Sequence, residues 1–205
     1  MAFRIQKIQQ MNEKTAEIIA SFDHSLDSFD ASGPTQGLKN EQALNSYLTA
    51  LALRRSLGLE AALESESFSK ACFRMLEAWG MNRRSAKLVG TTILRESLAR
   101  NSPALLRFKE FRLDLVDESR AAIIASQLWP VLASLEVGTQ QTKIVANSKI
   151  GHLLFPDLVP PIDNRYTLRF FEIPSFPFDQ EPAAFCEIYA RFARIANACS
   201  SAIAR

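Results

Sequence analysis

The chain has 205 residues, of which 47% are hydrophobic and 22% charged, the composition of a folded globular domain. It contains neither a run of about 18 apolar residues, which a membrane-spanning helix needs, nor the apolar core of a secretory signal. We therefore expect a cytoplasmic protein without membrane contact. Three cysteines without a CxxC pair, and only two histidines, indicate free thiols, no metal site and no cofactor.

The net charge of +2 is small, but the positive charges gather in the middle of the chain. Residues 81–170 carry 13 basic and 8 acidic side chains, which gives 13 − 8 = +5, whereas residues 1–80 carry 8 and 10, which gives −2. A basic middle section is a mild indication of a polyanionic partner such as nucleic acid. An uneven surface without functional meaning explains the same pattern.

The first half of the chain is dominated by the three- and four-residue spacing of apolar side chains that is typical of helices. This spacing predicts helices over 3–22, 40–57 and 65–79. Asn40 is placed to cap the second helix, and Gly80 to close the third.

The second half continues the helical pattern, so we predict an all-α fold. A helix is expected over 83–100 with Asn82 as its cap, and another over 118–136 with Asp117 as its cap. Pro130 is expected to kink or split the latter helix, because proline lacks the N–H group that the helix needs. Two further helices are expected over residues 139–146 and 183–204.

The stretch "TKIVANSKIGHLLF", residues 142–155, is interpreted as a helix, a tight turn and a second helix. The first turn of the second helix contains Lys149. The N–H groups and the dipole of a helix start favour an anion, and the lysine adds a cation beside them. The stretch therefore predicts a contact with the DNA backbone, made by Lys143 and by three turn residues, Ala146, Asn147 and Ser148.

A stiff connector then leads to Asp163, because Pro156, Pro160 and Pro161 restrict the backbone. Asp163 precedes the segment "NRYTLRFF" at the N-cap position, and capping alone explains an aspartate there. A carboxylate at a helix start is also kept ionised by the dipole and the N–H groups. Such a carboxylate can stabilise a cationic sugar or steer a water to its C1′ atom.

The hairpin, the lysine after it and the aspartate after an apolar proline step together resemble the helix-hairpin-helix DNA glycosylase superfamily. The resemblance covers residues 140–171. It places Lys149 on the Schiff-base nucleophile of the bifunctional members and Asp163 on the catalytic aspartate. It also places Arg165 just inside the following helix, where we expect a DNA contact.

The resemblance implies a two-lobed helical fold and a monomer that binds double-stranded DNA between its lobes. Lobe A comprises about 1–39 and 156–205, and lobe B about 40–155 with the hairpin at 143–150. The implied activity is to flip a modified base out of the duplex and to cleave its N-glycosidic bond. Phage-defence glycosylases that attack hypermodified, for example glucosylated, cytosine are one branch that the chain is similar to.

A flipped base needs a flat wall for stacking and polar groups for its edge. The stretch "WGMNRRSAKL" offers Trp79 together with Asn82 and Arg83, and Tyr166 follows Asp163 by three residues on the same helix face. Core packing explains the tryptophan equally well, and a solvated surface explains the arginine.

Two other functions fit the same residues. A non-catalytic DNA-binding helical module uses Asp163 only as a helix cap, so that replacing the residue with asparagine changes nothing. A helical protein-interaction domain has no role with nucleic acid, and such a domain does not bind duplex DNA even at low salt.

Overall fold

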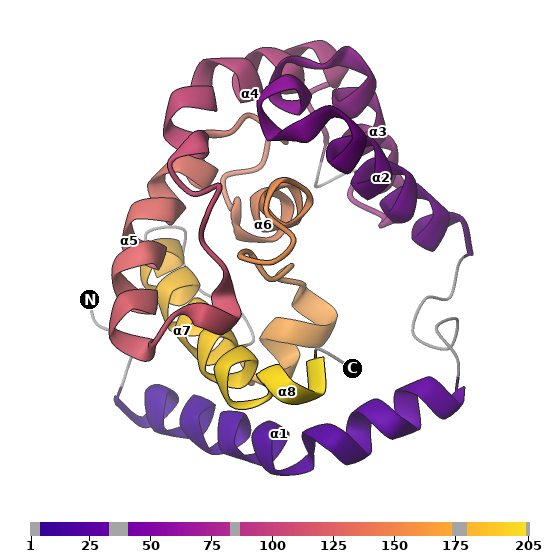
Figure 1. Cartoon of the computed structure of the whole chain (residues 1–205). Helices are drawn as coiled ribbons and strands as arrows, with labels where there is room; N and C mark the ends of the chain where they lie inside the picture. The colour runs from indigo at the N-terminus through magenta and orange to yellow at the C-terminus, as the bar shows by residue number, and fades with distance from the viewer. Residues whose placement is uncertain (1–4, 33–40, 83–86, 174–179, 204–205) are drawn as a thin grey trace.

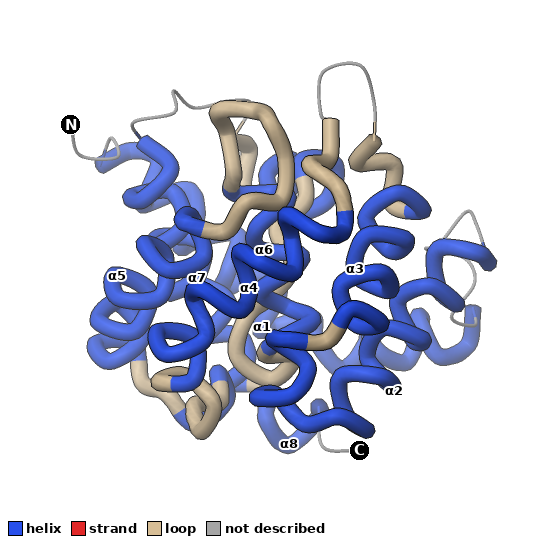
Figure 2. The backbone as a smooth tube through the Cα atoms, turned by 90° about the horizontal axis from the view of Figure 1, so that it is seen from above, coloured by secondary structure: helices blue, strands red, loops and turns tan. Residues whose placement is uncertain are grey.

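The computed structural model describes residues 5–32, 41–82, 87–173 and 180–203. Within these residues all regular elements are helices, apart from one isolated bridge between Leu88 and Gly138, which confirms the predicted all-α class (Figure 2). The elements in chain order are α1 (Ile5–Ser32), α2 (Glu41–Glu64), α3 (Glu66–Ala78), α4 (Thr91–Leu106), the 3-10 turn η1 (Leu113–Leu115), α5 (Glu118–Ser134), α6 (Ile144–Leu154), the π-helical segment η2 (Asn164–Leu168), α7 (Glu181–Ala198) and α8 (Ser200–Ile203).

The short helix α6 lies at the centre of the molecule (Figure 1). It packs against α2, α3 and α5. Helices α2, α3 and α4 pack on one another on one side of it, α5 packs along α7, and α1 runs along the outside of α7. One continuous cluster of buried apolar side chains joins these helices. The polar side chains of α6 must therefore find partners inside the core, because an unpaired polar group there is costly.

Two predicted helix ends are confirmed. Asp117 begins α5, and its Oδ1 accepts the backbone N–H of Arg120 at 2.8 Å. After α3 the chain turns at Gly80, whose φ of 74° suits glycine best, and the N–H of Met81 donates back to the carbonyl of Leu76 at 2.9 Å.

Glycines mark two further helix boundaries. Gly58 interrupts α2 with a non-helical φ of 74° and ψ of 164°, so the predicted helix end at residue 57 coincides with a kink, and a second helical stretch continues from there to Glu64. Helix α4 begins at Thr91 rather than at residue 83, because Gly90 precedes it with a φ of 101° and Leu88 pairs with Gly138.

Two corrections concern the later helices. Helix α5 is not split at Pro130 and continues to Ser134. Its packing along α7, where the rings of Trp129 and Phe185 stack with centroids 4.9 Å apart, compensates for the hydrogen bond that the proline removes. The final helix is divided at Cys199 into α7 and α8.

The predicted hairpin is absent. Residues 139–143 are not helical, and the residues expected to turn lie inside the continuous helix α6. Their exposed fractions are at most 2%, for Ala146 (1%), Asn147 (2%) and Ser148 (0%).

Partners from other elements explain why Asn147 and Ser148 are helical. The Asn147 side-chain amide donates to the carbonyls of Leu132 and Leu135, at 2.7 and 2.9 Å, where α5 ends. Ser148 Oγ accepts the backbone N–H of Ile162 at 3.0 Å. These buried hydrogen bonds outweigh the local preference of both residues for turns.

Candidate functional site

A partly buried ion pair joins the two residues whose chemistry the sequence analysis identified. Lys149 Nζ lies 3.1 Å from Asp163 Oδ2. The lysine side chain, in the middle of α6, is 4% exposed, whereas the aspartate side chain is 33% exposed. Solvent or a substrate therefore reaches this pair from the side of the carboxylate.

The connector after α6 fixes the position of Asp163. The bond from the Ile162 N–H to Ser148 holds the connector against α6, one residue before the aspartate. Asp163 then starts η2: its Oδ1 lies 3.4 Å from the N–H of Tyr166, and its carbonyl accepts the N–H of Leu168 at 2.9 Å. The aspartate thus contacts the segment that follows it in the manner of a helix cap, as the sequence predicts, while its other oxygen contacts the lysine.

Trp79 covers the lysine. Lys149 Nζ lies 5.2 Å from the centre of the Trp79 ring and 3.8 Å from the sulfur of Met81. A cation over the face of an indole is stabilised by the negative charge of the ring face. The structure therefore brings together Trp79, Lys149 and Asp163, three predicted site residues that are widely separated in the sequence.

Tyr47 packs on Trp79 and is itself held by His152. Tyr47 packs against Trp79 with ring centroids 5.6 Å apart. His152 Nδ1 lies 2.8 Å from the carbonyl of Val159, which can only accept, so Nε2 is the acceptor for the Tyr47 hydroxyl at 2.7 Å. Burial lowers the pKa of His152, against the opposing effects of Val159 and Asp157, and burial raises the pKa of Tyr47.

No local sequence pattern indicates a role for Tyr47. The residue lies on α2, 105 residues before its partner His152. Only the packing of α2 against α6 brings the two together.

The predicted phosphate contact at the start of α6 is wrong, because Glu181 occupies that position. This α7 residue is 2% exposed, and its carboxylate accepts the N–H groups of Lys143 and Ile144 at 2.8 and 3.0 Å. Lys143 Nζ donates to the carbonyl of Ala133 at 2.7 Å. The helix start does bind an anion, but that anion belongs to the chain itself. With the turn residues buried, this segment offers no site for a DNA phosphate.

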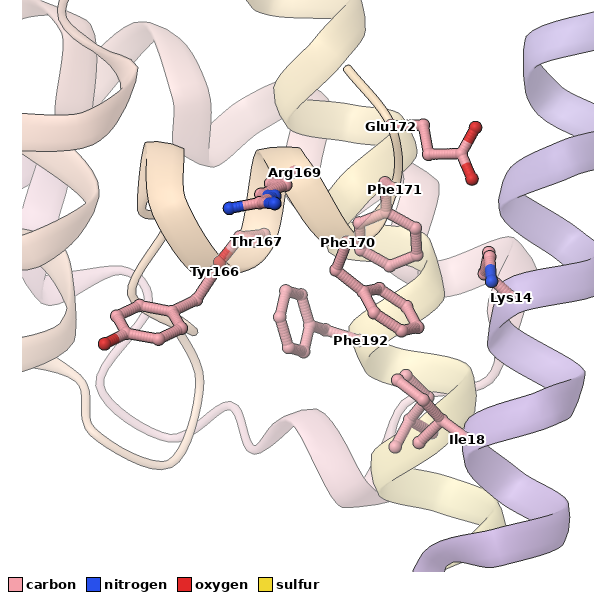
Figure 3. A pocket seen from close by; sticks show the side chains of 10 residues that line it. Lys14, Ile18, Tyr166, Thr167, Arg169, Phe170, Phe171, Glu172 and Phe192 are labelled. Atoms are coloured by element: carbon pink, nitrogen blue, oxygen red, sulfur yellow. The ribbon is translucent and has the colours of Figure 1, made fainter. Parts of the chain in front are cut away.

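The remaining predicted residues are Asn82, Arg83, Arg165 and Tyr166. Asn82 is exposed, and its amide donates to Glu77 at 3.0 Å. Arg83 and the side chain of Arg165 lie outside the described part of the chain. Tyr166 is 59% exposed and projects beside a hollow (Figure 3).

This hollow has a volume of about 750 Å³ and lies between α1, α7 and residues 166–172. We call it the aromatic hollow. It adjoins the ion pair, because two of its lining residues contact Asp163: the Tyr166 N–H approaches Oδ1, and Thr167 Oγ1 accepts the backbone N–H of Asp163 at 3.2 Å.

Among the described residues, no group of three or more His, Cys, Asp or Glu side chains could hold a metal ion. No described helix combines the length and the apolar character needed to cross a bilayer. Comparisons with protein-family models, curated proteins and solved structures found no match. The function is therefore inferred from the geometry of the site.

Proposed function

We propose that the chain is a DNA glycosylase whose reacting centre is the Lys149–Asp163 pair. The single observation that supports this best is the 3.1 Å contact between a buried ammonium group and a carboxylate open to solvent, beneath the face of Trp79. The proposal rests on this centre and no longer on a hairpin.

The exposed carboxylate suits cleavage of an N-glycosidic bond by water. As the bond breaks, its electron pair leaves with the base, which takes up a proton, and positive charge develops on the sugar. Asp163 is held ionised by the ammonium group 3.1 Å away and can stabilise that charge or orient the attacking water. Addition of water at C1′ then gives an abasic site and the free base, and the proton that this water loses to solvent balances the proton that the base takes up from solvent.

The burial of Lys149 favours water over the lysine amine as the nucleophile. An ammonium group has no free electron pair, so an attack would first require its proton to move to Asp163 or to water. With a side chain only 4% exposed, the lysine is also poorly placed to reach a sugar. We therefore propose a monofunctional enzyme in which Lys149 fixes the carboxylate.

The experiment is a base-release assay with the full chain on duplexes that carry different damaged or modified bases. Released base is measured by chromatography, and abasic sites are measured as strand breaks after alkali. We expect Asp163→Asn to lower release by about 100-fold or more without weakening DNA binding. Asp27→Asn, which changes an exposed carboxylate on α1, serves as the matched control.

Borohydride treatment during the reaction distinguishes the two nucleophiles, because it traps a lysine–sugar imine covalently. We expect no trapped complex. Base release that persists in Asp163→Asn contradicts the catalytic role of the carboxylate. Trapping that disappears in Lys149→Gln contradicts the monofunctional reaction.

A second candidate is a non-catalytic helical module, in which the pair is only structural. The observation that favours it is the 4% exposure of Lys149, already balanced by its neighbour. In that case none of the duplexes releases a base, and Asp163→Asn affects only stability.

A further inference from the structure

The aromatic hollow has a floor of rings that hold one another in place. Phe170 and Phe171 meet edge to face with centroids 5.1 Å apart, and Phe171 meets Phe192 edge to face at 6.3 Å. Figure 3 shows Phe170 and Phe192 side by side, with Ile18 below them and Tyr166 at one end. Flat, immobilised rings of this kind suit a flat apolar group.

The rim of the hollow carries two cations, Lys14 and Arg169. Lys14 Nζ lies 5.9 Å from the centre of the Phe170 ring and 3.1 Å from the exposed carboxylate of Glu17. Arg169 is exposed and has no ion-pair partner within the described part of the chain. The hollow therefore combines a flat apolar floor with positive charge at its edge.

The one carboxylate in the lining is already engaged. The Glu172 side chain accepts a hydrogen bond from the Gln10 amide, and its backbone carbonyl accepts one from Lys7. Glu172 thus contributes to joining α1 to the body of the protein, and Lys14 is paired with Glu17, so Arg169 is the rim cation that can attract an anion.

We propose that the aromatic hollow binds one nucleotide of an unpaired DNA strand. The base stacks on the rings of Tyr166, Phe170 and Phe192, and the phosphate lies toward Arg169. Stacking on aromatic side chains beside a basic rim is a general way to hold single-stranded nucleic acid without reading its sequence. This inference rests on the proposed function for its choice of partner, because two residues that line the hollow, Tyr166 and Thr167, contact Asp163.

The position of the hollow gives the bound nucleotide a role. When the base pair next to the extruded nucleotide also opens, an adjacent nucleotide becomes available to the hollow. A neighbour stacked on Tyr166, three residues along the chain from the aspartate, keeps the strand open and in register. The hollow therefore stabilises the extruded state without taking part in bond cleavage.

The test measures fluorescence anisotropy of a labelled five-nucleotide oligothymidylate with the full chain, with thymidine monophosphate as an unlabelled competitor. Tyr166→Ala is expected to weaken binding about five- to hundredfold, and Tyr166→Phe to bind like the wild type because its ring face remains. Ile123→Ala, which truncates an apolar side chain that is 58% exposed on α5, is the matched control.

The salt dependence of binding tests the phosphate contact. Arg169→Gln is expected to reduce the slope of log affinity against log salt by about 0.7, whereas Arg100→Gln, an exposed arginine on α4, leaves it unchanged. Stronger competition by the free monophosphate than by unlabelled oligothymidylate would indicate a site for free nucleotides and overturn the strand assignment.

The outcomes separate this inference from the proposed function. No binding of the oligonucleotide, or equal binding by Tyr166→Ala and Ile123→Ala, overturns the inference even where base release is observed. Conversely, binding that depends on Tyr166 without any base release supports the inference and contradicts the glycosylase proposal.

Discussion

The Tyr47 hydroxyl donates a hydrogen bond to Nε2 of His152 at 2.7 Å, and the two rings stack at an interplanar angle of 9°. The bond connects α2 to the helix that carries Lys149. It also requires a neutral imidazole, because Nδ1 already donates to the carbonyl of Val159 and a protonated Nε2 could no longer accept. Protonation of His152 therefore breaks its hydrogen bond to Tyr47, the residue that packs on Trp79.

We expect the stability of the protein to fall as the pH drops below 6.5, the ordinary pKa of histidine. Burial lowers the pKa of His152 in the folded protein, so the unfolded chain takes up a proton first and is favoured. Each pH unit in this window costs at most about 1.4 kcal/mol. Thermal unfolding between pH 5 and 7.5 measures the effect.

Comparison of two histidine variants isolates this contribution. His152→Gln is expected to flatten the dependence of Tm on pH in this window, whereas His24→Gln, on the exposed part of α1, leaves it unchanged. A His152→Gln protein with the same pH slope as the wild type would show that other groups cause the acid sensitivity.

Replacing Asn147 with alanine is expected to destabilise the fold by about 1–3 kcal/mol, because the carbonyls of Leu132 and Leu135 lose a buried donor. Asn45→Ala removes an exposed asparagine from α2 and is expected to change stability by no more than about 0.5 kcal/mol. Urea unfolding of both variants gives the difference. Unchanged stability together with weaker DNA binding would instead support a phosphate contact at this position.

Local sequence chemistry was sufficient to predict the helical class and some helix ends. Asp117 and Gly80 have the predicted roles because a cap depends on the residue itself and on N–H or carbonyl groups a few positions away. The same logic failed at Asn147 and Ser148. Both residues favour turns in isolation, but their partners come from α5 and from the connector before Asp163.

The candidate site was only partly predictable for the same reason. Lys149 and Asp163 were identified from their chemistry, but their 3.1 Å contact depends on the connector returning along α6. The support from Tyr47 depends on the packing of α2 on α6. The aromatic hollow combines α1 and α7 from opposite ends of the chain, which no local pattern reveals.

Replacing Glu181 with alanine is expected to destabilise the protein by about 1.5–3 kcal/mol, since hydrogen bonds to a charged group are among the stronger ones. The N–H groups of Lys143 and Ile144 lose their acceptor at the start of α6. Glu118→Ala, an exposed residue in the first turn of α5, is the control and is expected to have a small effect. Equal urea midpoints for the two variants would contradict this role of Glu181.

The two members of the Lys149–Asp163 pair should respond unequally to mutation. Asp163→Asn leaves an ammonium group that is almost fully buried without its counter-charge, whereas Lys149→Met leaves a carboxylate that is one-third exposed and can be hydrated. Breaking a fully buried pair costs about 3–5 kcal/mol. We expect roughly 2–4 kcal/mol for Asp163→Asn and about 1–2 kcal/mol for Lys149→Met, reduced for the solvent that reaches Asp163.

The double variant should regain part of the loss, because neither charge is then left alone. Urea unfolding of the three variants measures these differences, and a larger loss for Lys149→Met than for Asp163→Asn would mean that the carboxylate, rather than the ammonium group, depends on the pairing.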